Sequence, residues 1–392
     1  MVWITATDAL ELMNVRAQTL YANVSRGKIR AKRDTKDCRR SLYHRDDVLR
    51  LSKQHRGQRK VDDVAAQAME WGVPVLPSAI STIRDGRLWY RGQDAVDLSN
   101  NCQLEDIANV LWEGAAIRVG AVGATRPAYV GVDEPGDPLS RGLMALALRC
   151  AKDLPTYGRS TAVLREEAAG VLSTLLCSMF GSTNEQPGGS ISVQIATAWQ
   201  CPQAEPIIRQ ALVLLADHEL NASTFATRVT ISTGASLAAG VLTGLATLTG
   251  PLHGRAVMSL STLTDDVTRI GAEAAVREWL QQGRPFPAFG HPLYPDGDPR
   301  ASALLGQLPL APEYVDLAVW VERLVGELPN VDFALAAMAR AYGLPVESPL
   351  ALFAAGRCVG WLAHALEQAE SGHLIRPRAR YIGINAPIKL KA

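Results

Sequence analysis

The sequence lacks the short motifs that would assign several common chemistries. Its 392 residues contain no GxGxxG, GxxxxGK(S/T) or HExxH segment, which argues against dinucleotide-binding, phosphate-loop and zinc-protease classes. The six cysteines form no CxxC pair, so we expect neither a zinc ribbon nor a disulfide framework, and a cytoplasmic setting fits best. The first 13 residues show no basic stretch followed by an apolar run, so we expect no secretory signal peptide.

Charge is also missing from one long stretch, residues 229–252. These 24 residues would be long enough to cross a membrane. However, 11 of the 24 are Gly, Ser or Thr, which makes the stretch less apolar than a lipid-facing helix and suits close helix packing. We therefore expect a buried helix in the core or in a dimer interface, and no membrane partner.

The charges that are present are distributed unevenly along the chain. Residues 1–60 hold 15 Lys and Arg against 6 Asp and Glu, a net charge of +9. Because the whole chain has a net charge of +1, the remaining residues together carry −8. This change in charge predicts a domain boundary near residue 60, with residues 53–63 as the linker.

The basic part has an informative order of elements. Residues 5–15 and 16–27 favour two helices, and residues 28–51 favour a short hairpin followed by a third helix. This order resembles the winged helix-turn-helix modules of the excisionase and MerR type, and we assign it to residues 1–58. In such modules the second helix enters the major groove of DNA and basic residues meet phosphates. The residues so placed include Arg16, Gln18, Thr19, Arg26, Lys28 and Arg30.

A second interpretation of the basic module stays open. The same helices and charges would also suit docking onto an acidic enzyme body or partner, because a small fold is weak evidence of function.

The rest of the chain favours a mainly α fold. Long apolar stretches at helical spacing recur from residue 64 onward, and strand candidates are few. The clearest strands are at residues 81–94, where Asp85 and Gly86 predict a tight hairpin turn.

Three of the seven histidines stand in polar or glycine-flanked segments. They are His218 in "ADHELNAST", His253 in "GPLHG" and His291 in "FGHPLYPDGDPR". Together with Asp332 in "LPNVDFALA", they indicate a catalytic site. We interpret His44, His55, His364 and His373 as ordinary histidines on basic or solvated stretches.

These segments resemble the citrate synthase family from about residue 61 to the end. "DHELNASTFATRV", "GPLHG", "FGHPLYPDGDPRA", "PNVDF", "FAAGRCVGWLAHALEQ" and "RPRARYIG" carry the likeness, together with the early "GRLWYRGQDAVDL". The resemblance implies a two-domain helical fold, with a large domain at residues 59–255 and 339–392 and a small domain at residues 256–338. It further implies that acetyl-CoA is condensed with oxaloacetate and the citryl thioester hydrolysed.

The resemblance implies a role for each matching residue. His218, Arg300, Arg357 and Arg376 would bind oxaloacetate, and Arg376 would come from the neighbouring subunit of a homodimer. Arginine forks suit a dicarboxylate because they bind carboxylates in pairs of hydrogen bonds. Asp332 would remove the methyl proton, a neutral His253 would donate to the thioester oxygen, and His291 would donate to the ketone oxygen. No metal or prosthetic group is implied, since acetyl-CoA is a substrate.

The sequence leaves the acyl donor and the enzymatic role open. Arg255, Ala256 and Val257 stand where the family usually has Gly-Ala-Asn, and Pro292 stands where arginine is common. A 2-methylcitrate synthase that uses propionyl-CoA fits the same motifs, because one methylene changes binding by only about 1–3 kcal/mol. A transcriptional regulator whose enzyme-like body senses metabolites is the third interpretation, and the basic N-terminus supports it.

Overall fold

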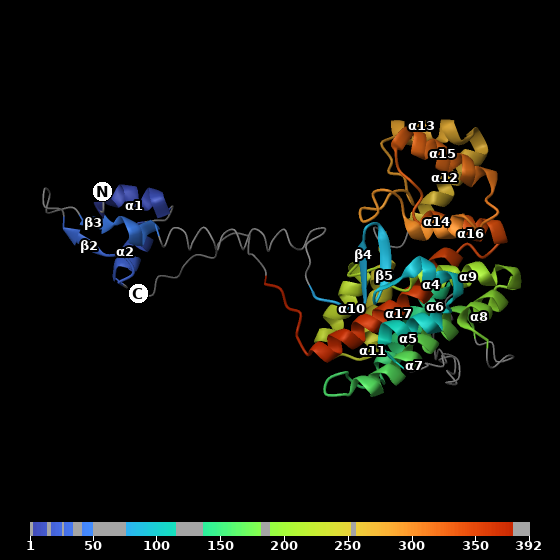
Figure 1. The fold of residues 1–392 in the computed structure, drawn as a ribbon, viewed down its shortest axis with the longest axis horizontal. Coiled ribbons are helices and arrows are strands. Elements are labelled where there is room, and N and C mark those ends of the chain that lie inside the picture. Colours follow the sequence, from blue (N-terminus) through green and yellow to red (C-terminus); the bar gives the residue numbers. More distant parts are fainter. Residues whose placement is uncertain are drawn as a thin grey trace. The chain divides into compact units, whose positions relative to one another are not determined.

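The computed structural model describes residues 3–13, 17–25, 27–33, 41–49, 76–114, 136–181, 189–251 and 256–378 (Figure 1). The chain divides into two compact units, one of Met1–Pro77 with Arg378–Ala392 and the other of Ser78–Pro377. The predicted linker, residues 53–63, lies outside the described residues.

The first unit contains two short helices and a small antiparallel sheet. The helices are α1 (Ala6–Met13) and α2 (Ala17–Ser25), and residues 45–49 are also helical. The strands β1 (Trp3–Ile4), β2 (Ala31–Arg33) and β3 (Ser41–His44) lie in the order β1-β3-β2. The helices and the hairpin β2-β3 occupy the predicted positions, whereas β1 was not predicted. Together they enclose a small core of Ala9, Met13, Leu20, Ile29, Tyr43 and Val48.

The second unit begins with the predicted hairpin. Strands β4 (Ser81–Arg84) and β5 (Arg87–Tyr90) pair antiparallel, and the short β6 (Gln93–Asp94) follows on β5. The turn residues Asp85 and Gly86 have φ angles of +53° and +70°. Positive φ at both positions is the geometry that favours Asp-Gly in a two-residue hairpin turn.

In the described part of the second unit, the other regular elements are helices, which fall into two groups. One group contains the helix α17 (Ser348–Ser371) and its neighbours: α4 (Ala95–Asn101), α5 (Leu104–Trp112), α6 (Pro138–Cys150), α7 (Thr161–Phe180), α8 (Ile191–Ala198), α9 (Glu205–Leu215), α10 (Ala222–Ser232) and α11 (Leu237–Leu248), with a short 3-10 helix at Pro202–Ala204. The other group is α12 (Ala256–Ile270), α13 (Ala272–Gln281), α14 (Pro299–Leu305), α15 (Pro312–Val325) and α16 (Val331–Tyr342). The prediction of a mainly α fold is confirmed.

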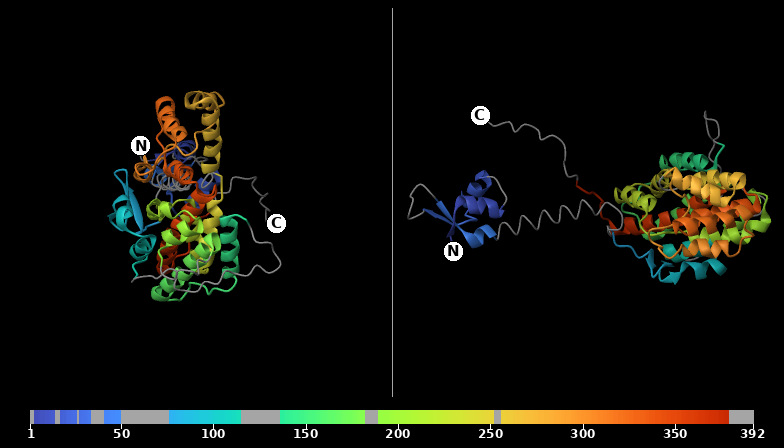
Figure 2. Two further views of the ribbon diagram at one scale, coloured as in Figure 1. Left: turned by 90° about the vertical axis from the view of Figure 1, so that its right-hand side faces the viewer. Right: turned by 90° about the horizontal axis from the view of Figure 1, so that it is seen from above.

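The two groups meet where the candidate site residues lie. Helix α17 packs against α5, α7, α9, α10 and α11, whereas α12 packs against α13, α15 and α16. Contacts of α14 with α9, and of α16 with α17, join the groups. Figures 1 and 2 show α12, α13 and α15 projecting from the rest of this unit, with α14 and α16 at their base.

Helix α17 is the only helix among the described residues that is long and apolar enough to cross a membrane. Its most apolar 18-residue window has a mean hydropathy of 1.3, and 94% of that window is buried inside the protein. Surrounding helices cover it on all sides, which explains a hydrophobic composition without lipid.

Residues 229–251, the described part of the uncharged stretch, contain the end of α10 and all of α11 rather than the single helix predicted from their composition. Helix α10 ends at Ser232, Gly234 turns the chain with φ of +84°, and Ser236 caps the start of α11. The prediction of one helix was therefore wrong, although the helices are largely buried as expected. Gly240 allows their close packing, since a Cβ there would lie 2.8 Å from the side chain of Ile231.

Candidate active site

The loop between α9 and α10 carries His218. The next residue, Glu219, has φ of +53°, a left-handed conformation that is uncommon outside glycine. The carboxylate of Asp217 stabilises this conformation by accepting the backbone N–H of Glu219 at 3.2 Å and a close hydrogen bond from the hydroxyl of Ser81 on β4. The hairpin and the loop thus hold His218 in place together.

His364 on α17 contacts the same loop through Asp217. Its Nε2 lies 3.3 Å from Oδ1 of Asp217, and neither side chain is exposed. Burial opposes ionisation of Asp217, yet His364 and Arg357 together hold the pKa of this carboxyl below its usual value. The interpretation of His364 as a solvated histidine was wrong, because its side chain is fully buried within α17.

Arg357 reaches the site from the middle of α17 and is 1% exposed. Its Nε donates to the carbonyl of Leu215 at 2.9 Å. Its Nη1 and Nη2 are buried without a hydrogen-bond partner in the part of the chain that the structure describes. Burial, with the charge of Arg300, lowers its pKa to about 10. A buried guanidinium with two unused nitrogens is costly unless an anion binds there.

Two glycines of α17 bring Arg357 to this position. A Cβ at Gly356 would lie 2.9 Å from the carbonyl oxygen of Leu212, and a Cβ at Gly360 would collide with Ala216 and Asp217. The backbone of α17 therefore touches the end of α9 directly. Only glycine permits this approach on both sides of the arginine.

The second histidine loop, residues 288–298, lies against the first. The rings of His291 and His218 meet edge to face with centroids 5.0 Å apart. The hydroxyl of Tyr294 is 3.0 Å from Nε2 of His218. The backbone N–H of Leu293 donates to Nδ1 of His291 at 3.1 Å, so a neutral His291 carries its proton on Nε2.

Both imidazoles are neutral near pH 7. Burial and the positive charge of Arg300 lower the pKa of His291 to about 4. Burial, Arg300 and Arg357 lower the pKa of His218 well below 6.5. The site therefore combines neutral N–H donors with fixed positive charge, which suits an oxygen atom that gains negative charge during a reaction.

Asp298 fixes the orientation of Arg300, the second residue of α14. Nε and Nη2 of Arg300 donate to its two carboxylate oxygens at 2.9 and 2.8 Å. The N–H of Val331, the first residue of α16, donates to the same carboxylate at 3.0 Å. Each member of the pair is 2% exposed. Asp298 thus ties the arginine to the start of the helix that carries Asp332.

Asp332 is the second residue of α16. Its N–H donates to Oδ1 of Asn330, the N-cap residue, at 3.0 Å. Burial raises the pKa of its carboxyl to about 6, and the charges of Arg300 and Arg357 only partly offset that effect. A carboxylate with a pKa near the working pH is effective as a general base.

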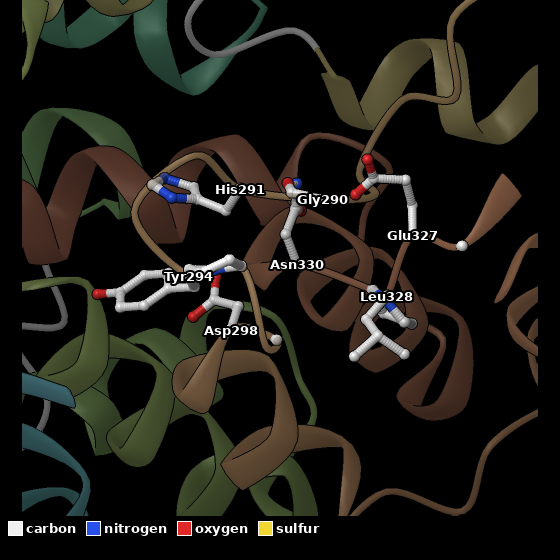
Figure 3. A pocket seen from close by; sticks show the side chains of 11 residues that line it. Gly290, His291, Tyr294, Asp298, Glu327, Leu328 and Asn330 are labelled. Carbon is white, nitrogen blue, oxygen red and sulfur yellow. Dashed lines mark hydrogen bonds between the residues drawn. The ribbon is translucent and has the colours of Figure 1, made fainter. Parts of the chain in front are cut away.

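A small cavity of about 50 Å³ lies between the histidine loop and the segment before α16 (Figure 3). Gly290, His291, Tyr294, Asp298, Glu327 and Asn330 are among its lining residues. Figure 3 shows the rings of His291 and Tyr294 on one side of Gly290 and the carboxylate of Glu327 on the other. A volume of this size suits a few waters, since ligand pockets measure roughly 300–1,000 Å³.

Five of the seven predicted enzyme residues belong to this arrangement: His218, His291, Arg300, Asp332 and Arg357. Arg376 is exposed in the extended segment after α17, and His253 lies outside the described residues, as does Arg255. No group of three or more His, Cys, Asp or Glu side chains among the described residues could hold a metal ion.

Sequence reasoning did not identify four buried polar residues of the site, Asp217, His364, Tyr294 and Asp298. Three of them adjoin predicted residues in the motifs "DHE" and "YPDGDPR", so their position in the sequence was a usable signal. His364 stands in the same quoted segment as Arg357, but its contact with Asp217, 147 residues away, could not be read from the sequence.

Comparisons with known proteins agree with this arrangement. Residues 141–378 match the family model "Citrate synthase, C-terminal domain". The chain is 31% identical over 357 residues to a citrate synthase of Haloferax volcanii, covering 80% of this chain and 94% of that one. It is 28% identical over 369 residues to a 2-methylcitrate synthase of Mycobacterium tuberculosis, covering 80% and 89%.

A solved structure shows the same fold. The citrate synthase from Thermotoga maritima superposes with a TM-score of 0.67 at 25% identity, covering 83% of this chain and 97% of that one. Together with the matching family model and the Haloferax relative, this establishes that the chain belongs to the citrate synthase family.

Proposed function

We propose that this protein is a citrate synthase, which condenses acetyl-CoA with oxaloacetate and hydrolyses the citryl thioester to citrate and CoA. The observation that carries the proposal is the buried guanidinium of Arg357, with Nη1 and Nη2 unused, beside Arg300, two neutral imidazoles and a carboxyl of raised pKa. Family membership supports it.

Oxaloacetate would bind between the two histidine loops. Arg357 supplies two donors for one carboxylate, and Asp298 keeps Arg300 pointed toward the site. His218 would donate a further hydrogen bond to the same substrate. Nε2 of His291, which carries the proton of the neutral ring, would donate to the ketone oxygen. Each charge-assisted hydrogen bond of this kind contributes about 1.5–3 kcal/mol.

The reaction would then proceed in three steps. Asp332 takes a proton from the methyl group of acetyl-CoA while His253, a residue outside the described ones, donates a hydrogen bond to the thioester oxygen. The carbon of the resulting enolate forms a bond to the ketone carbon, and the Nε2–H of His291 donates a hydrogen bond to the former ketone oxygen. That oxygen finally takes up a proton equivalent to the one that Asp332 removed. Water then cleaves the thioester to citrate and CoA. No step needs a metal or a prosthetic group.

Turnover and its dependence on Asp332 test this proposal. Thiol release from acetyl-CoA should require oxaloacetate, and Asp332→Asn should abolish it while the protein stays folded. Silence of the folded wild type with acetyl-, propionyl- and butyryl-CoA would instead favour a metabolite sensor. Higher kcat/KM with propionyl-CoA than with acetyl-CoA would identify a 2-methylcitrate synthase, the activity for which the mycobacterial relative is named.

We further propose the domain division and the homodimer that the family resemblance implies. Residues 59–255 with 339–392 would form the large domain and residues 256–338 the small one, and contacts of α14 with α9 join them. Arg376 is exposed in this chain, which leaves it available to a partner's site. The protein would act in the cytoplasm.

Mixing two inactive variants tests the shared site. In a dimer that combines Arg376→Gln with Asp332→Asn, one of the two sites regains Asp332 from its own chain and Arg376 from its partner. Exchange of subunits in an equal mixture should therefore restore about a quarter of wild-type turnover. A mixture that stays inactive despite proven subunit exchange would show that each chain uses its own Arg376.

For the first unit we propose DNA binding through a winged helix-turn-helix at residues 1–58. Thr19 and Lys28 are exposed, as are all three residues of β2, which adds Lys32 and Arg33 to the available surface. Arg30 is exposed but already forms two hydrogen bonds to Asp47, at 2.8 and 3.1 Å. Arg16 and Arg26 and the side chain of Gln18 lie outside the described residues.

Salt dependence tests the DNA proposal. Affinity for duplex DNA should fall steeply between about 50 and 200 mM salt, because released counterions drive binding. Negligible binding at low salt would leave docking on an acidic partner as the role of the module.

A further inference from the structure

His291 and Asp332 each follow a short chain segment, and these two segments pair with each other by backbone hydrogen bonds. Phe289 and Pro329 form an isolated antiparallel bridge, and the N–H of Gly290 donates to the carbonyl of Leu328 at 2.8 Å. The segment 288–290 leads directly to His291, and the segment 328–330 leads directly to α16. A change in the pairing of these two segments would therefore alter the separation between His291 and Asp332.

The first segment has a strained backbone. Ala288 has φ of +65° and Gly290 has φ of +67°. The left-handed region costs an alanine about 1–2 kcal/mol, so surrounding contacts must hold Ala288 there. Ala288 is buried. The strain is therefore located at Ala288, three residues before His291.

Asn330 holds both ends of the strained segment. Its backbone N–H donates to the carbonyl of Ala288 at 3.0 Å, and its side-chain Nδ2 donates to the carbonyl of Gly290 at 3.0 Å. The other side-chain atom, Oδ1, accepts the N–H of Asp332 at 3.0 Å. One amide group thus connects the residue before His291 with the backbone of Asp332.

We propose that Asn330 is a positioning residue, whose side-chain amide fixes the separation of His291 and Asp332 by joining the carbonyl of Gly290 to the first turn of α16. This role rests on the proposed condensation, in which both groups must act on one pair of reacting carbons. A displacement of about 1 Å in such a site can cost about 100-fold in rate. Asn330 touches no reacting atom and acts through its two neighbours.

A merely structural role as a helix cap makes a different prediction. Ser and Asp cap helices about as well as Asn, so either should replace a cap without loss. Neither offers the planar N–H that reaches the carbonyl of Gly290, and Asp would place a second acceptor against that carbonyl. Asn330→Ser and Asn330→Asp therefore keep the cap and break the connection.

The experiment measures kcat, KM for oxaloacetate and the melting temperature of both variants. We expect kcat to fall about 10- to 100-fold, KM to change less than about threefold, and the melting temperature to stay within about 2 °C of wild type. Asp137, the N-cap of α6, provides a matched control at a distance from the site. Asp137→Ser should leave kcat unchanged.

A partial reaction separates positioning from general loss of structure. With malate, which lacks the ketone, exchange of the acetyl-CoA methyl protons with deuterated water reports proton removal without condensation. Because positioning concerns the pair of groups, condensation should fall at least about fivefold more than exchange in Asn330→Ser. Equal losses in both reactions, or a kcat within about threefold of wild type in both variants, would overturn the role of Asn330 while wild-type turnover upholds the proposed function. A wild type without turnover would overturn that function itself.

Discussion

Replacing Arg357 with methionine should abolish oxaloacetate binding and at the same time stabilise the free protein. Nη1 and Nη2 are buried without hydrogen-bond partners among the described residues, and the pKa of the guanidinium is lowered to about 10, mainly by burial. The guanidinium lies over the ring of Phe353, 4.7 Å from its centroid, but Nη1 and Nη2 gain hydrogen-bond partners only when an anion binds. Methionine has a similar length, suits a helix and needs no polar partner.

The magnitude of the stabilisation is the difference between two opposing effects on hydrogen bonding. Two unsatisfied polar nitrogens cost about 1–3 kcal/mol each, so their removal stabilises the free protein by about 2–6 kcal/mol. The loss of the Nε bond to Leu215, with that carbonyl left unpaired, costs about 2–4 kcal/mol. A net stabilisation of about 1 kcal/mol remains, which should raise the melting temperature by about 2–4 °C.

Thermal unfolding with and without oxaloacetate measures both effects. The wild type should gain about 2.7 kcal/mol at an oxaloacetate concentration 100 times the Kd, and Arg357→Met should gain nothing. Arg340→Met is a matched control, because Arg340 forms only an exposed ion pair with Glu313, at 2.9 Å. Such pairs contribute about 0–1 kcal/mol. A variant of Arg357 that melts well below wild type, or that oxaloacetate still stabilises, would refute the reasoning.

Three further predictions concern the pKa of Asp332, a helix contact and the buried contact between His364 and Asp217. Asp332 must be ionised to act and its pKa is about 6, so kcat/KM should fall tenfold per pH unit below pH about 6. Burial favours the protonated form of Asp332 in the folded state. The stability of Asp332→Asn relative to wild type should therefore increase as pH rises from about 4 to 7. Gly360→Ala should destabilise by about 1–3 kcal/mol through overpacking against Ala216, whereas Gly136→Ala, with open space around it, should be neutral in the same melting assay. His364→Gln should cost about 1–3 kcal/mol in denaturant unfolding, because Oδ1 of Asp217 loses its buried imidazole neighbour while Ser81 and Glu219 still donate to Oδ2, and Asp217→Asn in addition should recover part of that loss.

Much of the fold was predictable because its signals are local. The hairpin turn at Asp85 and Gly86 needs two positive φ angles, and Asp followed by Gly is a pair that favours such angles. The break between α10 and α11 was missed because the prediction used the overall composition of residues 229–252 and not the positions of individual residues within it. Gly234 and Ser236 are a turn residue and an N-cap residue, and together they marked the end of one helix and the start of the next.

The candidate residues of the site could be named from the sequence, whereas the contacts that support them could not. His218, His291, Arg300 and Asp332 stand in short motifs whose residue types are visible in the sequence without knowledge of the fold. The partners of His364 depend instead on tertiary packing, because a histidine on a helix is solvated or buried according to what surrounds the helix. Gly356 and Gly360 determine that α17 touches the end of α9, and this contact places His364 beside Asp217.

The buried charges of the site give a physical reason for a second subunit. Arg300 and Arg357 contribute two positive charges, but Asp217 and Asp298 are close to them and the pKa of each carboxyl is held below its usual value. These four groups therefore sum to no net charge, whereas oxaloacetate carries two negative charges. His218 and His291 do not supply the missing positive charge, because their lowered pKa values keep both rings neutral. We therefore expect a further cation to enter with the substrate, and in the proposed homodimer Arg376 of the partner subunit would provide it without the cost of burying another charge in the free protein.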